Sequence, residues 1–105
     1  MSERIKVIVA GAGGRMGREV LKLVLGDEQL ELAAAIGRSD AGRDAGELVG
    51  MPSADVKLVP SLEEALSSAK ADVLVDFTTP EFAYEHARLA IEHGVRPVMG
   101  TTGYT

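Results

Sequence analysis

The residues best suited to chemistry are the glycines that follow the first apolar segment of the chain. They belong to Gly11-Ala12-Gly13-Gly14-Arg15-Met16-Gly17, which lies between an apolar run and an amphipathic pattern. A phosphate group needs backbone N–H groups that point at it and no Cβ in the way, and a helix N-terminus supplies both the N–H groups and a partial positive charge. Glycine also permits the tight turn and the close approach of a pyrophosphate.

The spacing of this segment is G-x-x-G-x-x-G through Gly11, Gly14 and Gly17, because Met16 departs from strict G-x-G-x-x-G. Between a strand and a helix, the pattern predicts that Gly11, Ala12, Gly13, Gly14, Arg15, Met16 and Gly17 bind a dinucleotide. The alternative is a turn with a structural role only.

The residues after the second apolar segment are expected to select the cofactor. An acid there accepts hydrogen bonds from the adenosine ribose and repels a 2′-phosphate. In this chain Ile36 is followed by Gly37-Arg38-Ser39-Asp40, so glycine takes the acid's place and a guanidinium suited to phosphate follows. We therefore expect NADPH to be preferred over NADH, with Arg38 as the main cause. The alternative is a solvated Arg38, with Asp40 holding the ribose.

Two further segments follow apolar runs, at strand ends where open α/β sheets place ligands. Phe77 lies in Asp76-Phe77-Thr78-Thr79-Pro80 and could lie against a flat nicotinamide ring, although a core position is its default interpretation. Gly100, Thr101 and Thr102 begin the second segment, whose backbone and hydroxyl groups could bind the nicotinamide carboxamide. By itself this second segment would be an ordinary polar turn.

The elements that position these residues alternate between strands and helices. Apolar runs predict strands, and three- to four-residue spacing or capping signals predict helices. The expected strands are Ile5–Ala10, Leu30–Ile36, Lys57–Val59, Asp72–Phe77 and Arg96–Met99; the expected helices cover Arg15–Leu25, Ser61 to Ala69 and Thr79 to His93, with a helical turn near Ala45–Val49. This order predicts an α/β, Rossmann-type doubly wound parallel sheet with strand order 3-2-1-4-5.

Composition narrows the function classes. The 105 residues include no Cys, which excludes a thiol nucleophile and a Cys-ligated metal, and the two His seven residues apart offer no metal site. The net charge of −5 argues against a dedicated nucleic-acid surface. No apolar run approaches the ~20 residues of a membrane span, so we expect a cytoplasmic protein without nucleic-acid or membrane partners.

Four segments together resemble dihydrodipicolinate reductase, the 4-hydroxy-tetrahydrodipicolinate reductase of bacterial diaminopimelate and lysine biosynthesis. They occur in the family's order and at its spacing, over essentially the whole chain: Val9 to Gly17, Asp44-Ala45-Gly46-Glu47, Val75-Asp76-Phe77-Thr78 and Gly100-Thr101-Thr102-Gly103. The resemblance implies a cytoplasmic, homotetrameric oxidoreductase in which NAD(P)H delivers a hydride to a cyclic dicarboxylate. It places Gly11 to Met16 on the pyrophosphate, Arg38 on the 2′-phosphate, and Gly100, Thr101 and Thr102 beside the nicotinamide.

Two departures from the family matter. Many members carry an acid where this chain has Gly37, and that acid supports NADH use, so dual specificity is less assured here. The family's substrate domain, with its His-His-and-Lys motif, follows the last segment, and neither His86 nor His93 matches it. We therefore expect residues 1–105 to form an NAD(P)H-binding domain that contains no catalytic residue and binds cofactor without turnover. The alternative is a free-standing NAD(P)-binding or redox-sensing module.

Overall fold

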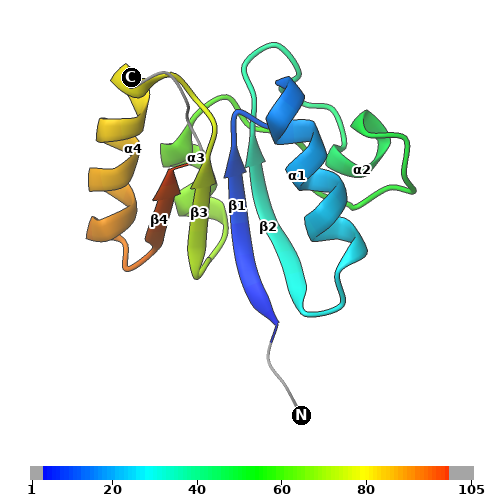
Figure 1. Ribbon diagram of the computed structural model, residues 1–105, viewed down its shortest axis with the longest axis horizontal. Helices are drawn as coiled ribbons and strands as arrows, with labels where there is room; N and C mark the ends of the chain where they lie inside the picture. Colours follow the sequence, from blue (N-terminus) through cyan, green and yellow to red (C-terminus); the bar gives the residue numbers. More distant parts are fainter. Residues whose placement is uncertain (1–3, 100–105) are drawn as a thin grey trace.

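Four parallel strands form the centre of the computed structural model, which describes residues 4–99 (Figure 1). The strands are β1 (Ile5–Ala10), β2 (Leu30–Ile36), β3 (Val73–Asp76) and β4 (Arg96–Met99), in the spatial order β2-β1-β3-β4. Parallel neighbours require crossover connections, and helices supply them here. The predicted Rossmann-type α/β class is confirmed.

The third expected strand, Lys57–Val59, is present only as a fragment. Val59 forms an isolated parallel bridge to Ile36, and its N–H donates to the Ala35 carbonyl. Lys57 instead pairs with Asp44 in an antiparallel bridge. Pro60 follows and has no N–H to extend the ladder, so the prediction of a full strand is wrong. The spatial order 3-2-1-4-5 is otherwise retained, with this fragment beside β2.

Four helices connect and cover the strands: α1 (Arg15–Gly26), α2 (Ala45–Leu48), α3 (Leu62–Ser68) and α4 (Pro80–Glu92). Ser61 caps α3 by accepting a hydrogen bond from the Glu64 N–H, as its sequence predicts. Thr79 occupies the N-cap position of α4, but its side chain makes no capping bond. Helix α1 extends one residue beyond its expected end at Leu25, to Gly26. A left-handed glycine follows α4 at Gly94, with φ of 74°.

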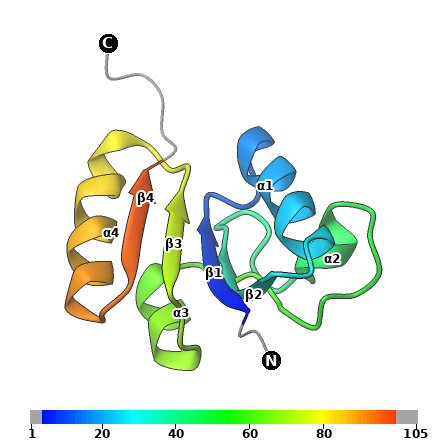
Figure 2. The same cartoon turned by 60° about the horizontal axis from the view of Figure 1, so that its bottom comes forward.

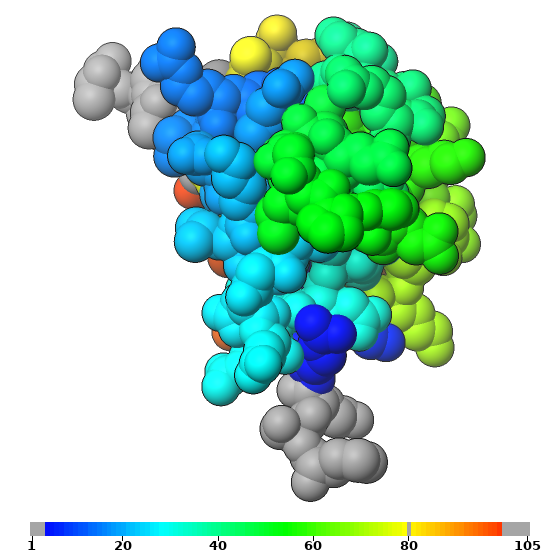
Figure 3. Space-filling model, turned by 90° about the vertical axis from the view of Figure 1, so that its right-hand side faces the viewer, coloured from blue at the N-terminus to red at the C-terminus, as the bar shows by residue number. Residues whose placement is uncertain are grey.

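The helices form layers on both faces of the sheet (Figure 2). Along β1 the side chains alternate, so that Val7 and Val9 join the core beneath α1 and α2, whereas Ile8 and Ala10 join the core beneath α3 and α4. A strand buried on both faces explains why residues 7–10 are apolar without interruption. Figure 3 shows the outer face of the first layer, with α1 beside the segment that contains α2.

Asp44 organises the long segment between β2 and α3. Its carboxylate caps α2 through the Glu47 N–H and also accepts hydrogen bonds from the N–H groups of Ala54 and Val56 and from the Ser53 hydroxyl. The bond from Ala54, followed by that from Glu47, lowers the pKa of Asp44 to about 2. One carboxylate therefore joins the start of α2 to residues 53–56 of the same segment. Within residues 4–99, no helix has the length and apolarity to cross a bilayer.

Candidate functional site

The candidate site lies at the carboxyl edge of the sheet. Because all four strands are parallel, the residues that follow β1, β2 and β3 meet at one edge (Figure 1). These residues are Gly11 to Gly14, Gly37 to Asp40 and Phe77 to Thr79. The fold thus brings together three of the segments that the sequence singles out.

The glycine loop is held by close backbone contacts. Ala12 donates to the Ile36 carbonyl, Gly14 donates to the Gly11 carbonyl, and Gly11 has a left-handed φ of 77°. A Cβ at residue 17 would lie 2.7 Å from the Gly11 carbonyl carbon and 2.8 Å from the Ala12 Cα, and closer still to the Gly11 oxygen. Helix α1 therefore starts directly against the loop, which only glycine at residue 17 permits.

The N-terminus of α1 offers unpaired backbone donors. Its N-cap is Gly14, which has no side chain to accept a hydrogen bond. Among the residues that the structure describes, none accepts from the N–H groups of Arg15, Met16 or Gly17. Orphan amides at a helix N-terminus bind anions, and a phosphate fits this arrangement.

Two side chains brace the loop in a way that the sequence did not reveal. The Arg18 Nε donates to the Gly13 carbonyl at 2.9 Å, and its guanidinium lies 3.8 Å from the Asp40 carboxylate. Asp40 also pairs with Arg43 at 3.2 Å and lies in the space that a Cβ of residue 13 would occupy. The Arg18 side chain is 44% exposed, but its Nε holds the loop through Gly13.

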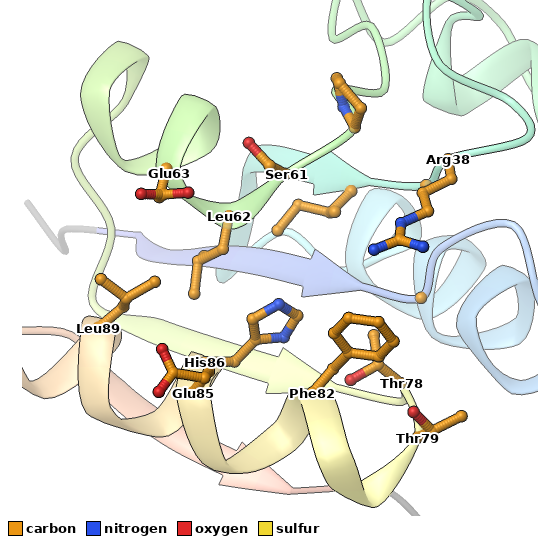
Figure 4. Close-up of a pocket in the computed structure, with 14 residues that line it drawn as sticks. Arg38, Ser61, Leu62, Glu63, Thr78, Thr79, Phe82, Glu85, His86 and Leu89 are labelled. Carbon is orange, nitrogen blue, oxygen red and sulfur yellow. The ribbon is translucent and has the colours of Figure 1, made fainter.

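A cavity of about 460 Å³ opens beside Gly11, between the end of β2 and helices α3 and α4 (Figure 4). Most of its exposed wall area is apolar, although polar and charged side chains also line it; the lining includes Ile36, Arg38, Leu62, Glu63, Thr78, Phe82, Glu85, His86 and Leu89. The Arg38 guanidinium carbon lies 4.8 Å from the centroid of the Phe82 ring, a cation–π distance. The Phe82 ring in turn stacks on His86, with 6.3 Å between the centroids.

Asp76, which is buried, and His86, which is half-buried, form a hydrogen-bonded pair on one side of this cavity. Asp76 has no exposed surface, and its Oδ2 lies 2.8 Å from the His86 Nδ1. Burial by itself raises the pKa of Asp76, but the hydrogen bonds from His86 and Thr78 outweigh it, so the pKa is lowered below its ordinary value. The sequence alone did not predict this pair. The available signal was an acid that ends the apolar run Val73-Leu74-Val75.

The predicted site residues are distributed as follows. The segment Gly11 to Gly17 and Arg38 share the carboxyl edge. Phe77 is half-buried, its backbone lies against Gly11, and its ring does not line the cavity. Gly100, Thr101 and Thr102 fall outside the described residues. In the described part of the chain, no three His, Cys, Asp or Glu side chains gather as a metal site would require.

Comparisons with known proteins point to one family. The family described as "Dihydrodipicolinate reductase, N-terminus" matches residues 5–105. A 4-hydroxy-tetrahydrodipicolinate reductase of Syntrophomonas wolfei is 46% identical over 103 residues, which cover 98% of this chain and 39% of that protein. This chain therefore spans about two fifths of that relative's length.

Solved structures agree with this match. A dipicolinate-bound dihydrodipicolinate reductase from Paenisporosarcina sp. TG-14 superposes with a TM-score of 0.77 at 38% identity, covering 97% of this chain and 39% of that one. An amine dehydrogenase from Mycobacterium smegmatis has a TM-score of 0.78 at 28% identity, covering 90% and 29% of the two chains. The same architecture is thus present in a second oxidoreductase.

Proposed function

Because the chain belongs to the dihydrodipicolinate reductase family and matches its N-terminal part, we propose that residues 1–105 form the dinucleotide-binding domain of a 4-hydroxy-tetrahydrodipicolinate reductase. The observation that supports this most is the start of α1. Three N–H groups stand there without an acceptor among residues 4–99, beside a loop that lies too close to α1 for a side chain at residue 17. This arrangement suits a pyrophosphate.

Different residues at the carboxyl edge of the sheet would bind different parts of the dinucleotide. The amides of Arg15, Met16 and Gly17 would hold the pyrophosphate. The cavity between Arg38 and His86 has an apolar lining suited to the adenosine half. Phe77, with Gly100, Thr101 and Thr102, would face the nicotinamide half. When bound, the nicotinamide supplies the hydride that reduces a cyclic dicarboxylate in diaminopimelate and lysine biosynthesis.

Arg38 is proposed as the residue that favours NADPH over NADH. It is exposed at the mouth of the cavity, free of any carboxylate partner among residues 4–99, and its planar guanidinium rests on Phe82. The competing ribose ligand, Asp40, is engaged by Arg18 and Arg43. An acid at residue 37 is absent, so nothing at that position repels a 2′-phosphate.

The test compares dissociation constants of NADPH and NADH in the wild-type protein and in Arg38→Ala. Loss of one charge-assisted phosphate contact should weaken NADPH by about tenfold to a hundredfold, with little effect on NADH. Arg96→Ala is a charge-matched control, because Arg96 is exposed at the start of β4, at the opposite edge of the sheet. An unchanged NADPH-to-NADH ratio in Arg38→Ala would refute the assignment.

The isolated 105-residue chain is proposed to bind NADPH weakly and to turn over nothing, because the family's substrate-binding motif is not matched by either histidine. In the whole protein we propose a cytoplasmic homotetramer. Steady-state NADPH oxidation with the dicarboxylate substrate tests the first point. Clear turnover by residues 1–105 alone would contradict it.

A further inference from the structure

Three charged side chains gather beside the glycine loop, and the dinucleotide-binding role proposed above does not use them. The Asp40 carboxylate lies 3.8 Å from the Arg18 guanidinium and 3.2 Å from that of Arg43. The Arg18 and Arg43 side chains are 44% and 60% exposed, and ion pairs that involve such exposed groups contribute little to stability. The significance of this cluster therefore lies in the group that it holds in place.

Arg18 holds the peptide group that joins Gly13 to Gly14. Its Nε donates to the Gly13 carbonyl at 2.9 Å, and its backbone N–H donates to the Gly14 carbonyl at 2.9 Å, which is the first hydrogen bond of α1. The N–H of the same peptide, that of Gly14, donates to the Gly11 carbonyl at 3.1 Å. Both polar groups of this peptide thus have partners in the loop or in the helix that follows it.

The orientation of this peptide matters because it adjoins the proposed anion site. Glycine on both sides leaves the peptide free to rotate unless hydrogen bonds fix it. A rotation that turned the Gly13 carbonyl toward the start of α1 would place a partial negative charge beside the N–H groups of Arg15 and Met16, where a phosphate is proposed to bind. The hydrogen bond from Arg18 keeps this oxygen directed at the guanidinium instead.

Asp40 connects this arrangement to the loop that follows β2. Its side chain is only 15% exposed, and its Oδ2 occupies the space that a Cβ of residue 13 would fill, so the carboxylate lies directly against the glycine loop. A lone carboxylate there would repel a phosphate. Two guanidinium groups against one carboxylate leave the cluster with one net positive charge. Asp40 can therefore orient Arg18 without making the loop unfavourable for an anion.

We propose that Arg18 is a positioning residue of the pyrophosphate site, which fixes the Gly13 carbonyl through its Nε, and that Asp40 acts through Arg18. This inference rests on the proposed function, in which the glycine loop binds the pyrophosphate of the cofactor. Arg18 does not need to touch the ligand in this role. NADPH and NADH share the pyrophosphate, so both depend on Arg18 to the same degree, whereas only NADPH depends on Arg38.

The experiment measures dissociation constants of the purified protein for NADPH and NADH. Arg18→Ala should weaken both about tenfold, the equivalent of one net hydrogen bond, and leave their ratio unchanged. Arg18→Gln should stay within about threefold of the wild type, because the Gln amide nitrogen is as many bonds from the backbone as the Arg Nε and can donate to the same carbonyl. A residue that bound phosphate by its charge would lose as much affinity in Arg18→Gln as in Arg18→Ala. Lys22→Ala is the charge-matched control: Lys22 lies one turn further along α1, pairs with Glu19, and should affect neither cofactor.

A double-mutant cycle tests the role of Asp40. Loss of a negative charge beside an anion site should by itself strengthen NADPH binding, whereas the proposal expects Asp40→Ala to weaken both cofactors, because Arg18 loses the group that orients it. The double variant should bind no more weakly than Arg18→Ala, since two residues that act through one contact are not additive. Tighter NADPH binding in Asp40→Ala, weakening of NADH alone, or additive losses in the double variant would overturn the proposal.

The outcomes separate this inference from the proposed function. Wild-type protein that binds neither cofactor would refute both. Wild-type protein that binds them, with affinities unchanged in Arg18→Ala or equally reduced in Arg18→Ala and Arg18→Gln, would overturn the positioning role alone. If Arg18→Ala fails to fold by circular dichroism, Arg18→Met takes its place, because it keeps an unbranched side chain with a methyl group at the position of Nε. A loss in Arg18→Met that Arg18→Gln does not share supports the proposal, and equal affinities of these two variants overturn it.

Discussion

Replacement of Gly17 by alanine should destabilise the protein although alanine is the better helix former. The new Cβ would lie 2.7 Å and 2.8 Å from backbone carbons of Gly11 and Ala12, against ~3.5–4.0 Å for carbon atoms at their optimum separation. No side chain can rotate away to relieve the contact, so α1 and the loop must separate by about 1 Å.

The expected magnitude follows from two opposing effects. Overpacking of this kind costs up to ~3 kcal/mol, and the gain in helix propensity from glycine to alanine returns ~1 kcal/mol. The net loss of about 2 kcal/mol should lower the Tm of a domain of this size by about 10 °C. Because the displaced amides are those proposed to hold the pyrophosphate, NADPH affinity should fall as well.

Gly26→Ala provides the control for Gly17→Ala. Gly26 ends the same helix, and a Cβ there would have nothing within 4 Å. The same substitution should therefore be neutral or stabilising by less than about 1 kcal/mol. Thermal unfolding followed by circular dichroism measures both variants. If Gly17→Ala melted at or above the wild-type temperature, the argument from close backbone packing would be refuted.

Three further substitutions test separate parts of the structure. Asp44→Asn should flatten the pH dependence of the Tm. The folded-state pKa of about 2 lies below the ordinary 3.8, so the stabilisation by this carboxylate is fully present above pH 3.8 and is lost as the pH falls toward 2. A fall in Tm below pH 3.8 that is the same in the variant and the wild type would contradict this. Ser61→Ala removes the N-cap of α3 and should cost about 1 kcal/mol in urea unfolding, whereas Ser67→Ala, on the same helix, should cost less. Gly37→Glu should shift preference toward NADH, because the carboxylate repels a 2′-phosphate. The only tight contact of its Cβ is with a terminal methyl of Leu58 at 2.8 Å, and the Gly13 nitrogen lies at an ordinary 3.5 Å. A ratio of dissociation constants that does not move would count against the proposed role of this position.

Local patterns predicted most of the fold because they depend on neighbours along the chain. The apolar runs and helical spacings located β1, β2, α1 and α4 to within one residue at each end. The expected strand Lys57–Val59 failed for the opposite reason. Whether so short a segment extends a sheet depends on its spatial neighbours, and here Lys57 pairs with Asp44 and not with β2.

In the candidate site, too, the sequence predicted what depends on neighbours along the chain and missed what depends on spatial neighbours. The glycine segment and Arg38 were identified from residue type and spacing, and the fold places them at one edge of the sheet. Phe82 and His86 were not assigned to a site, because nothing along α4 indicates that these positions face the end of β2 rather than solvent.

By itself, the sequence determined the alternation of strands and helices and the loop whose glycines suit a phosphate, since both follow from properties of residues close together in the chain. Only the tertiary structure decided which side chains share the cavity. Arg38, Phe82 and His86 come from two separate segments, and Asp76 reaches His86 from a neighbouring strand. Such contacts depend on how helices pack on the sheet, and the packing of α4 on β3 and β4 brings them together.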